Sequence, residues 1–310
     1  MRQPANVKPF DEAPTRLTTT DAVELARAYS YCRETTRRHA KSFYFSARFL
    51  PREKRPAIYA VYALCRHVDD EVDEAGVLDE AGARAAVEKW RVELQAAYRG
   101  ESVSSPVLIA WRDMLTRYRI APELPLELMR GVLMDTYQKR YETWEELRVY
   151  CYRVASVVGL MTSEIFGYER PETLRYAEAL GLAMQLTNIL RDVGEDLRMG
   201  RVYLPRDEMR RFGVTEEDLI RGIVVEPFRA LMRFQINRAR ALYAEAEQGI
   251  SLLERDARFT VLLAARLYAR ILGEIERLDF DVFHRRAHLS FGQKLRALPG
   301  VWGEARRLSD

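Results

Sequence analysis

The strongest constraint on the fold is a helical spacing of apolar residues that runs from about Asp21 almost to the end of the chain. Two of the helical segments, VASVVGLMTSEIFG (154–167) and AEALGLAMQLTNIL (177–190), carry few charges. A helix that is apolar on most faces belongs at the centre of a bundle or around an apolar cavity. Small residues such as Gly159 and Gly181 suit either close helix packing or a cavity, and both interpretations stay open.

Prolines fall between the helical segments, where they mark breaks or first helical turns. We find no alternating apolar run flanked by Asn-Gly or Asp-Gly turns, which argues against a sheet. The sequence therefore predicts an all-α, single-domain bundle of about ten helices in residues 21–295, after a flexible N-terminal arm (1–20) and before a C-terminal tail (296–310). The predicted helices cover residues 22–40, 56–75, 79–98, 104–119, 124–139, 144–166, 172–198, 226–254 and 256–279.

Composition narrows the class of protein. The formal net charge is only +3, which argues against nucleic acid as the main partner. Three cysteines, Cys32, Cys65 and Cys151, lie far apart without a CxxC pair, as expected in a reducing compartment. We see neither a secretory signal nor a stretch approaching the roughly 18 apolar residues of a membrane span. These features predict a cytoplasmic protein.

The segment VYALCRHVDDEVDEAG (61–76) collects acidic residues after an apolar run. On a helix, Asp69, Asp70 and Asp73 share one face, and Arg66 lies one turn earlier. Two carboxylates about 6 Å apart repel by roughly 3 kcal/mol at an effective dielectric near 20, so the arrangement needs a cation or solvent. Taken alone, a solvated helix end is the simpler interpretation.

A second polar stripe changes that interpretation. In AMQLTNILRDVGEDL (183–197), Gln185, Asn188, Asp192 and Asp196 follow one another at spacings of three, four and four, along one face of an otherwise apolar helix. Buried amides and acids are costly unless they are paired or ligated. Two such helices facing each other would form a pocket of oxygen ligands.

Oxygen ligands at this density suit Mg²⁺ or Mn²⁺, and Mg²⁺ is commonly held by a few carboxylates together with substrate phosphates. Zinc is disfavoured because no histidine or cysteine joins either set. Arg66 and Arg191 lie beside the acids, and guanidinium binds phosphate bidentately. Since no Walker or GxGxxG loop is present, we infer a diphosphate at the mouth of an apolar cavity, an arrangement that suits isoprenoid chemistry.

Four segments resemble the squalene/phytoene synthase family, the head-to-head prenyl transferases. They are HAKSFYFSARFLP (39–51), YAVYALCRHVDDEVDE (59–74), YCYRVASVVGLM (150–161) and LTNILRDVGEDLRMGRVYLPRDEM (186–209). The resemblance covers residues 25–295. It implies an all-α isoprenoid synthase fold around a central apolar cavity, Mg²⁺ dependence, and condensation of two identical prenyl diphosphates through a cyclopropylcarbinyl diphosphate.

The resemblance also assigns roles to single residues. The residues implied to hold Mg²⁺ and the diphosphates are Asp69, Asp70, Asp73, Asn188, Asp192 and Asp196. Diphosphate contacts are implied for Lys41, Ser42, Arg66, Gln185, Arg191 and Arg286, with Arg285 as an alternative to the last. Phe43, Tyr62 and Tyr268 would line the cavity and steady cationic intermediates, and Tyr203 would belong to a flap over the site. Ala40 stands where some relatives carry a serine, which puts one diphosphate contact in doubt.

Within the family, VGEDLRMGRVYLPRDEM (193–209) and ILGEIERLDFDVFHRRA (271–287) are most similar to the phytoene synthases of carotenoid pathways. That similarity implies two molecules of geranylgeranyl diphosphate as substrate and no requirement for NADPH. The alternatives are squalene, dehydrosqualene or presqualene diphosphate formation from farnesyl diphosphate. A head-to-tail prenyl transferase fits NILRDVGED poorly, because DDxxD would be expected in both motifs. A non-catalytic helical scaffold is the alternative of another class, although it should have lost acids from one motif.

The C-terminal segment HRRAHLSFGQKLRALPGVW (284–302) is basic with apolar interruptions. Two interpretations fit this pattern: a solvated tail, or a contact with an anionic membrane surface, into which the hydrophobic substrate and product partition. Peripheral membrane association is therefore a hypothesis. No obligate protein partner is inferred.

Overall fold

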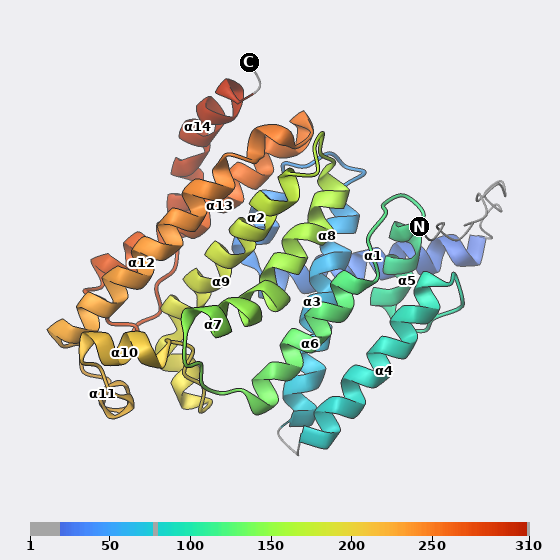
Figure 1. Cartoon of the computed structure of the whole chain (residues 1–310). Coiled ribbons are helices and arrows are strands. Elements are labelled where there is room, and N and C mark those ends of the chain that lie inside the picture. Colours follow the sequence, from blue (N-terminus) through green and yellow to red (C-terminus); the bar gives the residue numbers. More distant parts are fainter. Residues whose placement is uncertain (1–18, 77–79, 309–310) are drawn as a thin grey trace, which may run out of the picture.

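The computed structural model describes residues 19–76 and 80–308, and the side chains of 19, 20 and 73–76 lie outside that description (Figure 1). The predicted N-terminal arm falls almost wholly outside it, since residues 1–18 are not described. Within the described residues the protein is helical, and β-structure is limited to two isolated bridges, Arg140 with Val202 and Tyr168 with Leu253. The predicted all-α class is confirmed.

Fourteen α-helices and two short helices of other types occur in the described part of the chain. In chain order they are α1 (Thr19–His39), α2 (Lys41–Ala47), α3 (Arg55–Gly76), α4 (Glu80–Tyr98), α5 (Pro106–Leu115), α6 (Glu123–Tyr137), α7 (Trp144–Cys151), the π-helix η1 (Tyr152–Ser156), α8 (Val157–Phe166), α9 (Thr173–Arg198), α10 (Arg206–Phe212), α11 (Glu216–Arg221), α12 (Glu226–Glu247), the 3₁₀-helix η2 (Ile250–Leu252), α13 (Arg255–Arg277) and α14 (Phe291–Arg307).

Most predicted helices are present with bounds shifted by a few residues, and two differ in kind. The helix predicted over 144–166 is divided into α7, η1 and α8, because one turn of π-helix inserts at Tyr152–Ser156. The helix predicted over 226–254 ends at Glu247 and continues as η2. A π-turn widens a helix locally and is common where a helix borders a functional site.

Helix α14 extends from Phe291 to Arg307, so the segment expected to be a tail from residue 296 is largely helical. A capping box between Ser290 and Gln293 starts the helix, and its buried face packs on α13. Helices α2, α10 and α11 were also not predicted, since each has only six or seven residues and lacks a long periodic pattern. Within the described residues, no helix is both long and apolar enough to cross a membrane.

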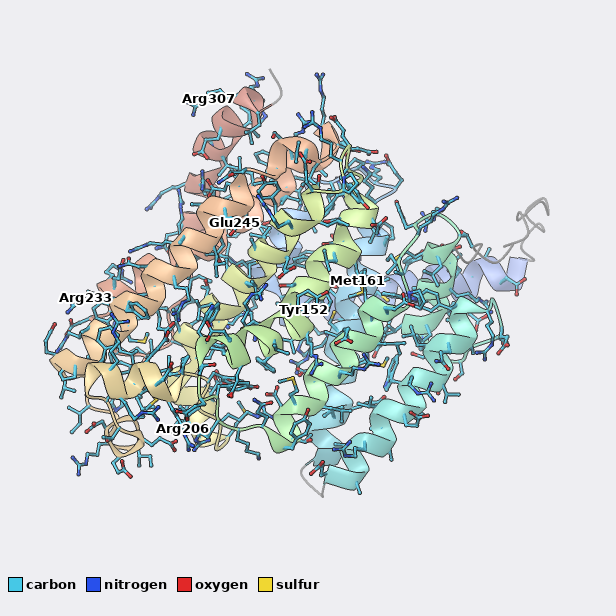
Figure 2. All side chains as sticks on the ribbon, in the orientation of Figure 1. Tyr152, Met161, Arg206, Arg233, Glu245 and Arg307 are labelled. Carbon is cyan, nitrogen blue, oxygen red and sulfur yellow. The ribbon has the colours of Figure 1, made fainter. Side chains whose placement is uncertain are left out.

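Helix α9 lies at the centre of the bundle and packs against α8, α12, α13 and η1. Close approach at its N-terminal half depends on glycine: a Cβ at Gly181 would lie 2.5 Å from the Cα of Ser156. Figure 2 shows how densely side chains fill the space between the helices, with Met161 of α8 in the interior. The nearly charge-free segments are therefore central, as their sequence predicted.

Candidate active site

A cavity of about 240 Å³ opens between α2, α3, η1, α8, α9 and α13. Most of its lining is apolar, and three aromatic side chains predicted to line it, Phe43, Tyr62 and Tyr268, do so. Phe43 stacks on Tyr62 with ring centroids 5.7 Å apart. Gln185 and Asn188 add amides to the same wall. The central apolar cavity predicted from the sequence is thus present.

The acids of α3 begin one turn beyond the cavity, four residues after Cys65, the last residue of that helix that lines it. Arg66 donates to both described carboxylates: its Nε lies 2.9 Å from Asp70 Oδ2 and its Nη1 lies 3.4 Å from Asp69 Oδ2. All three side chains are about one-third exposed or slightly more. The side chain of Asp73 lies outside the described residues, so its place in the site stays a prediction.

The acids of α9 also begin one turn beyond the cavity, four residues after Asn188. The Asn188 amide donates to Gln185 Oε1 over 3.3 Å. Asp192 is only 14% exposed and is held by Arg191, whose Nε lies 2.8 Å from Oδ1. Arg286 reaches the same carboxylate from a distant segment, with its Nε 2.9 Å from Asp192 Oδ1.

The approach of Arg286 depends on Gly194, which lies between the two acids of α9. A Cβ at Gly194 would lie 2.7 Å from both the Cα of Phe283 and the carbonyl oxygen of Val282. Glycine therefore lets the chain that follows α13 rest directly on α9. That contact places Arg286 on Asp192, while the choice between Arg285 and Arg286 as the diphosphate-binding residue stays a prediction.

Both acid sets lie at the same end of the cavity. Helices α3 and α9 both run downward in Figure 1, and each carries its acids on the C-terminal side of its lining residues. The charges beside both acid sets act on tyrosines of the cavity wall: those of α9 on Tyr268, and that of Arg66 on Tyr62. Burial raises the pKa of the Tyr268 phenol, while the charge of Arg191 lowers that pKa and the charge of Asp192 raises it. Burial also raises the pKa of Tyr62, which Arg66 opposes and Tyr268 reinforces.

The described donors fit a divalent cation in type, although they are not gathered into a metal site. Within the described ranges, no group of three His, Cys, Asp or Glu residues is arranged to hold a metal ion. Asp196 supports the fit, because burial and the nearby charges of Asp192 and Asp135 raise the pKa of its carboxyl to about 7. A bound divalent cation would offset that accumulated negative charge.

A buried polar cluster that the sequence did not predict lies beside Asp196. The Asp135 carboxylate accepts hydrogen bonds from Tyr203 over 2.6 Å and from Tyr150 over 2.9 Å. Tyr141 stacks on the Tyr203 ring and meets the Tyr150 ring at a tilt of 45°. Tyr203, expected on a flap, is therefore a buried side chain anchored to α6. The lone acid in the apolar stretch GVLMDTY (131–137) was the available signal, because a buried carboxylate needs donors.

The remaining predicted residues lie at the start of α2. Lys41 is exposed and Ser42 is partly buried, and they directly precede Phe43, the first residue of that helix that lines the cavity. Ala40 occupies the N-cap position and provides no side-chain cap, which a serine could provide. The diphosphate contacts of Lys41 and Ser42 stay predictions.

Comparison with known proteins places this geometry in a family. Residues 36–293, which are most of the chain, match the protein family described as squalene/phytoene synthase. The chain belongs to the squalene/phytoene synthase family. Members similar to it include the phytoene synthase of Arthrospira platensis, 42% identical over 91% of this chain and 94% of the relative. The 15-cis-phytoene synthase of Synechococcus elongatus is 41% identical over 89% of this chain and 92% of its own length.

Solved structures of the squalene/phytoene synthase family share the fold. A dehydrosqualene synthase bound to a ligand superposes with a TM-score of 0.86 at 31% identity, covering 93% of this chain and 99% of that one. A squalene synthase from Alicyclobacillus acidocaldarius gives 0.75 at 31% identity, covering 83% and 96%. The isoprenoid synthase fold implied by the sequence resemblance is therefore confirmed.

Proposed function

We propose that this protein is a phytoene synthase, a prenyl transferase that condenses two molecules of geranylgeranyl diphosphate head to head through a cyclopropylcarbinyl diphosphate. The observation that carries the proposal is the apolar cavity with carboxylates and arginines from two helices at one end. Its close relatives named phytoene synthase, about 40% identical over about 90% of the chain, support the choice within the family.

In this proposal Asp69, Asp70, Asp73, Asp192 and Asp196, with the Asn188 amide, hold Mg²⁺, for which Mn²⁺ could substitute. The metal supplies a Lewis acid that stabilises the departing diphosphate. The guanidinium groups of Arg66, Arg191 and Arg286 bind diphosphate oxygens, since they already lie beside the carboxylates. Gln185, Lys41 and Ser42 complete the diphosphate site.

The wall of the cavity protects the carbocation that forms when the diphosphate leaves. Apolar residues exclude water, which would otherwise capture the cation and end the reaction as an alcohol. The ring faces of Phe43, Tyr62 and Tyr268 offer electron density to the positive charge, and the described residues that line the cavity include no carboxylate. Loss of the second diphosphate, rearrangement of the cyclopropane and loss of a proton then give the hydrocarbon, with no reductant consumed.

Tyr203 acts in this proposal by holding the segment between α9 and α10 against Asp135, close to Asp196. The intact acids on both helices argue against a non-catalytic scaffold. The hydrophobic substrate tails and product also support peripheral association with a membrane, without an obligate protein partner. The cytoplasmic face of a membrane is the location proposed.

One experiment tests the proposal and its closest alternative. The purified protein is incubated with Mg²⁺ and either geranylgeranyl or farnesyl diphosphate, with and without NADPH, and the hydrocarbons are identified by chromatography and mass spectrometry. We expect phytoene from the C20 substrate, unchanged by NADPH and abolished by EDTA. A preference for the C15 substrate, giving dehydrosqualene or squalene, would replace the proposal by the farnesyl alternative, for which the dehydrosqualene synthase likeness is the structural support.

A further inference from the structure

The outward side of α14 carries large apolar side chains that water should disfavour. Phe291 is 65% exposed, Trp302 53% and Leu295 43%. At 100° per residue, these positions lie within about 40° of one another around the helix axis. Pro299, which is also exposed, belongs to the same stripe. The opposite side of α14, with Ala297 and Val301, is buried.

This stripe is continuous with a half-buried aromatic residue of α2, Phe45, and with the exposed Phe49 just after that helix. The Phe45 ring meets Phe291 edge-on with centroids 6.1 Å apart, and it meets Phe49 at 5.8 Å. Phe49 is itself 42% exposed. We call the surface formed by Phe45, Phe49, Phe291, Leu295 and Trp302 the α2–α14 face. A contiguous exposed apolar patch of this kind marks an interaction site.

Basic residues outnumber acidic ones on the two segments that carry the face. Residues 41–52 contain three basic residues and no acidic one. On α14 the acidic Glu304 is already paired with Arg266. The exposed basic side chains of these two segments are Lys41, Arg48, Arg52, Arg296, Arg306 and Arg307. The Arg306 guanidinium lies 3.7 Å from the Trp302 ring centroid, which puts a cation directly beside the aromatic stripe.

The face also lies on the outer side of the cavity wall. Phe43 and Ala47 of α2 line the cavity, as does Leu50, three residues after the helix ends. Phe45 on the same helix is half-buried beside the exposed Phe49. A single helix of seven residues therefore separates the α2–α14 face from the proposed prenyl site.

We propose that the α2–α14 face docks on the surface of an anionic lipid bilayer. Aromatic side chains favour the interface between headgroups and acyl chains, and basic side chains near them are attracted to anionic headgroups. A second copy of the chain is a poorer occupant, because a two-fold contact would bring the same cations against one another. The proposal deepens the peripheral association proposed above and does not depend on which prenyl diphosphate is condensed.

Vesicle flotation of the full chain, without substrate, tests the proposal. Vesicles of phosphatidylcholine with 30% phosphatidylglycerol, about a third anionic lipid, are compared with vesicles of phosphatidylcholine alone. We expect binding to the anionic vesicles that weakens in high salt. Phe291→Gln with Trp302→Gln should lower the partition coefficient on the order of 100-fold. Arg48→Gln and Arg296→Gln should each lower it about fivefold.

The matched control is Ile220→Gln with Ile223→Gln, because Ile220 and Ile223 are also highly exposed and lie at or just after α11, far from α14 in Figure 1. These changes should leave the partition coefficient unaltered. Circular dichroism melting of every variant checks that the fold is retained. In a second readout, brominated lipids should quench tryptophan fluorescence of the native chain, and Trp302→Phe should remove that quenching.

Two results would overturn the inference. One is equal vesicle binding by the native chain and the Phe291→Gln, Trp302→Gln variant, or no binding by either. The other is a native dimer that this variant converts to a monomer in sedimentation velocity, which would assign the face to a second copy. Because no substrate is present, a failure of the proposed condensation leaves these outcomes unaffected.

Discussion

Helices α3 and α9 each present carboxylates one turn beyond the cavity, but the partners of those carboxylates differ. Asp69 and Asp70 are partly exposed and contact Arg66 of their own helix. Asp192 is mostly buried, and it is held both by its neighbour Arg191 and by Arg286, which lies 94 residues further along the chain. The α3 set is therefore a local feature of one helix, whereas the α9 set is part of the tertiary structure.

This difference indicates that the two sets do not contribute equally to folding, even if they contribute equally to chemistry. An exposed pair within one helix adds little stability, while a mostly buried carboxylate with two guanidinium partners adds more. Four predictions examine the comparison.

The largest effect concerns turnover. Asp69→Asn and Asp192→Asn should each lower kcat by roughly 1000-fold or more, since loss of a metal-binding carboxylate removes several kcal/mol of transition-state stabilisation. Product formation is measured with Mg²⁺ and geranylgeranyl diphosphate. Glu71→Gln, on the same helix as Asp69, is the control and should stay near the native rate. Near-native turnover in either aspartate variant would disprove the two-helix metal site.

The second prediction concerns the long-range partner of α9. Arg286→Gln should lower kcat/KM by about 10- to 100-fold, because one charge-assisted hydrogen-bonding group near the diphosphate is lost. Arg285→Gln is the matched control and should remain within about twofold of the native value. The reverse ranking would show that Arg285 takes the proposed role when substrate is bound.

The third prediction addresses the contact that brings Arg286 to α9. Gly194→Ala should lower the free energy of unfolding by about 1–3 kcal/mol, since a Cβ there must displace the backbone at Phe283. Urea denaturation followed by circular dichroism measures the change. Gly273→Ala is a suitable control, because a Cβ at that position meets no atom within 4 Å. Equal stability of the two variants would contradict the close approach.

The smallest predicted effect compares how much the aspartates of the two helices contribute to the free energy of unfolding. In the presence of EDTA, Asp192→Asn should lower the free energy of unfolding by about 1–2 kcal/mol, whereas Asp69→Asn should change it by less than about 0.5 kcal/mol. Both values come from the same urea titrations. If Asp69→Asn proved the more destabilising, the distinction between a local and a tertiary acid set would be wrong.

The comparison also explains which parts of the site the sequence could predict. Helical spacing alone placed Asp69 and Asp70 on one face of α3, and Gln185, Asn188, Asp192 and Asp196 along α9, because such stripes depend only on the period of the helix. The nearly charge-free segments predicted a central position, with close helix packing and a cavity both left open. The family resemblance then supplied roles that spacing could not.

Features that depend on contacts between distant segments were harder to predict from the sequence. The bond between Arg286 and Asp192 depends on the turn after α13 and on Gly194. The Asp135 cluster requires side chains from three separate helical or loop segments to meet, and only the tertiary fold brings Tyr150 and Tyr203 to that carboxylate. The helical character of 291–307 was likewise obscured, because its apolar residues are divided between a buried side and the exposed α2–α14 face.

The short length of α2 has a consequence for the stability of the cavity wall. Seven residues are too few for a helix to persist by itself, so its order comes from packing on both of its sides. We expect its amides to exchange with solvent faster than those of α9. Any molecule that packs against one side of α2 stabilises the same helix for a molecule on the other side. Occupancy of the cavity and occupancy of the outer surface are therefore thermodynamically linked, and each must change the affinity for the other by the same factor.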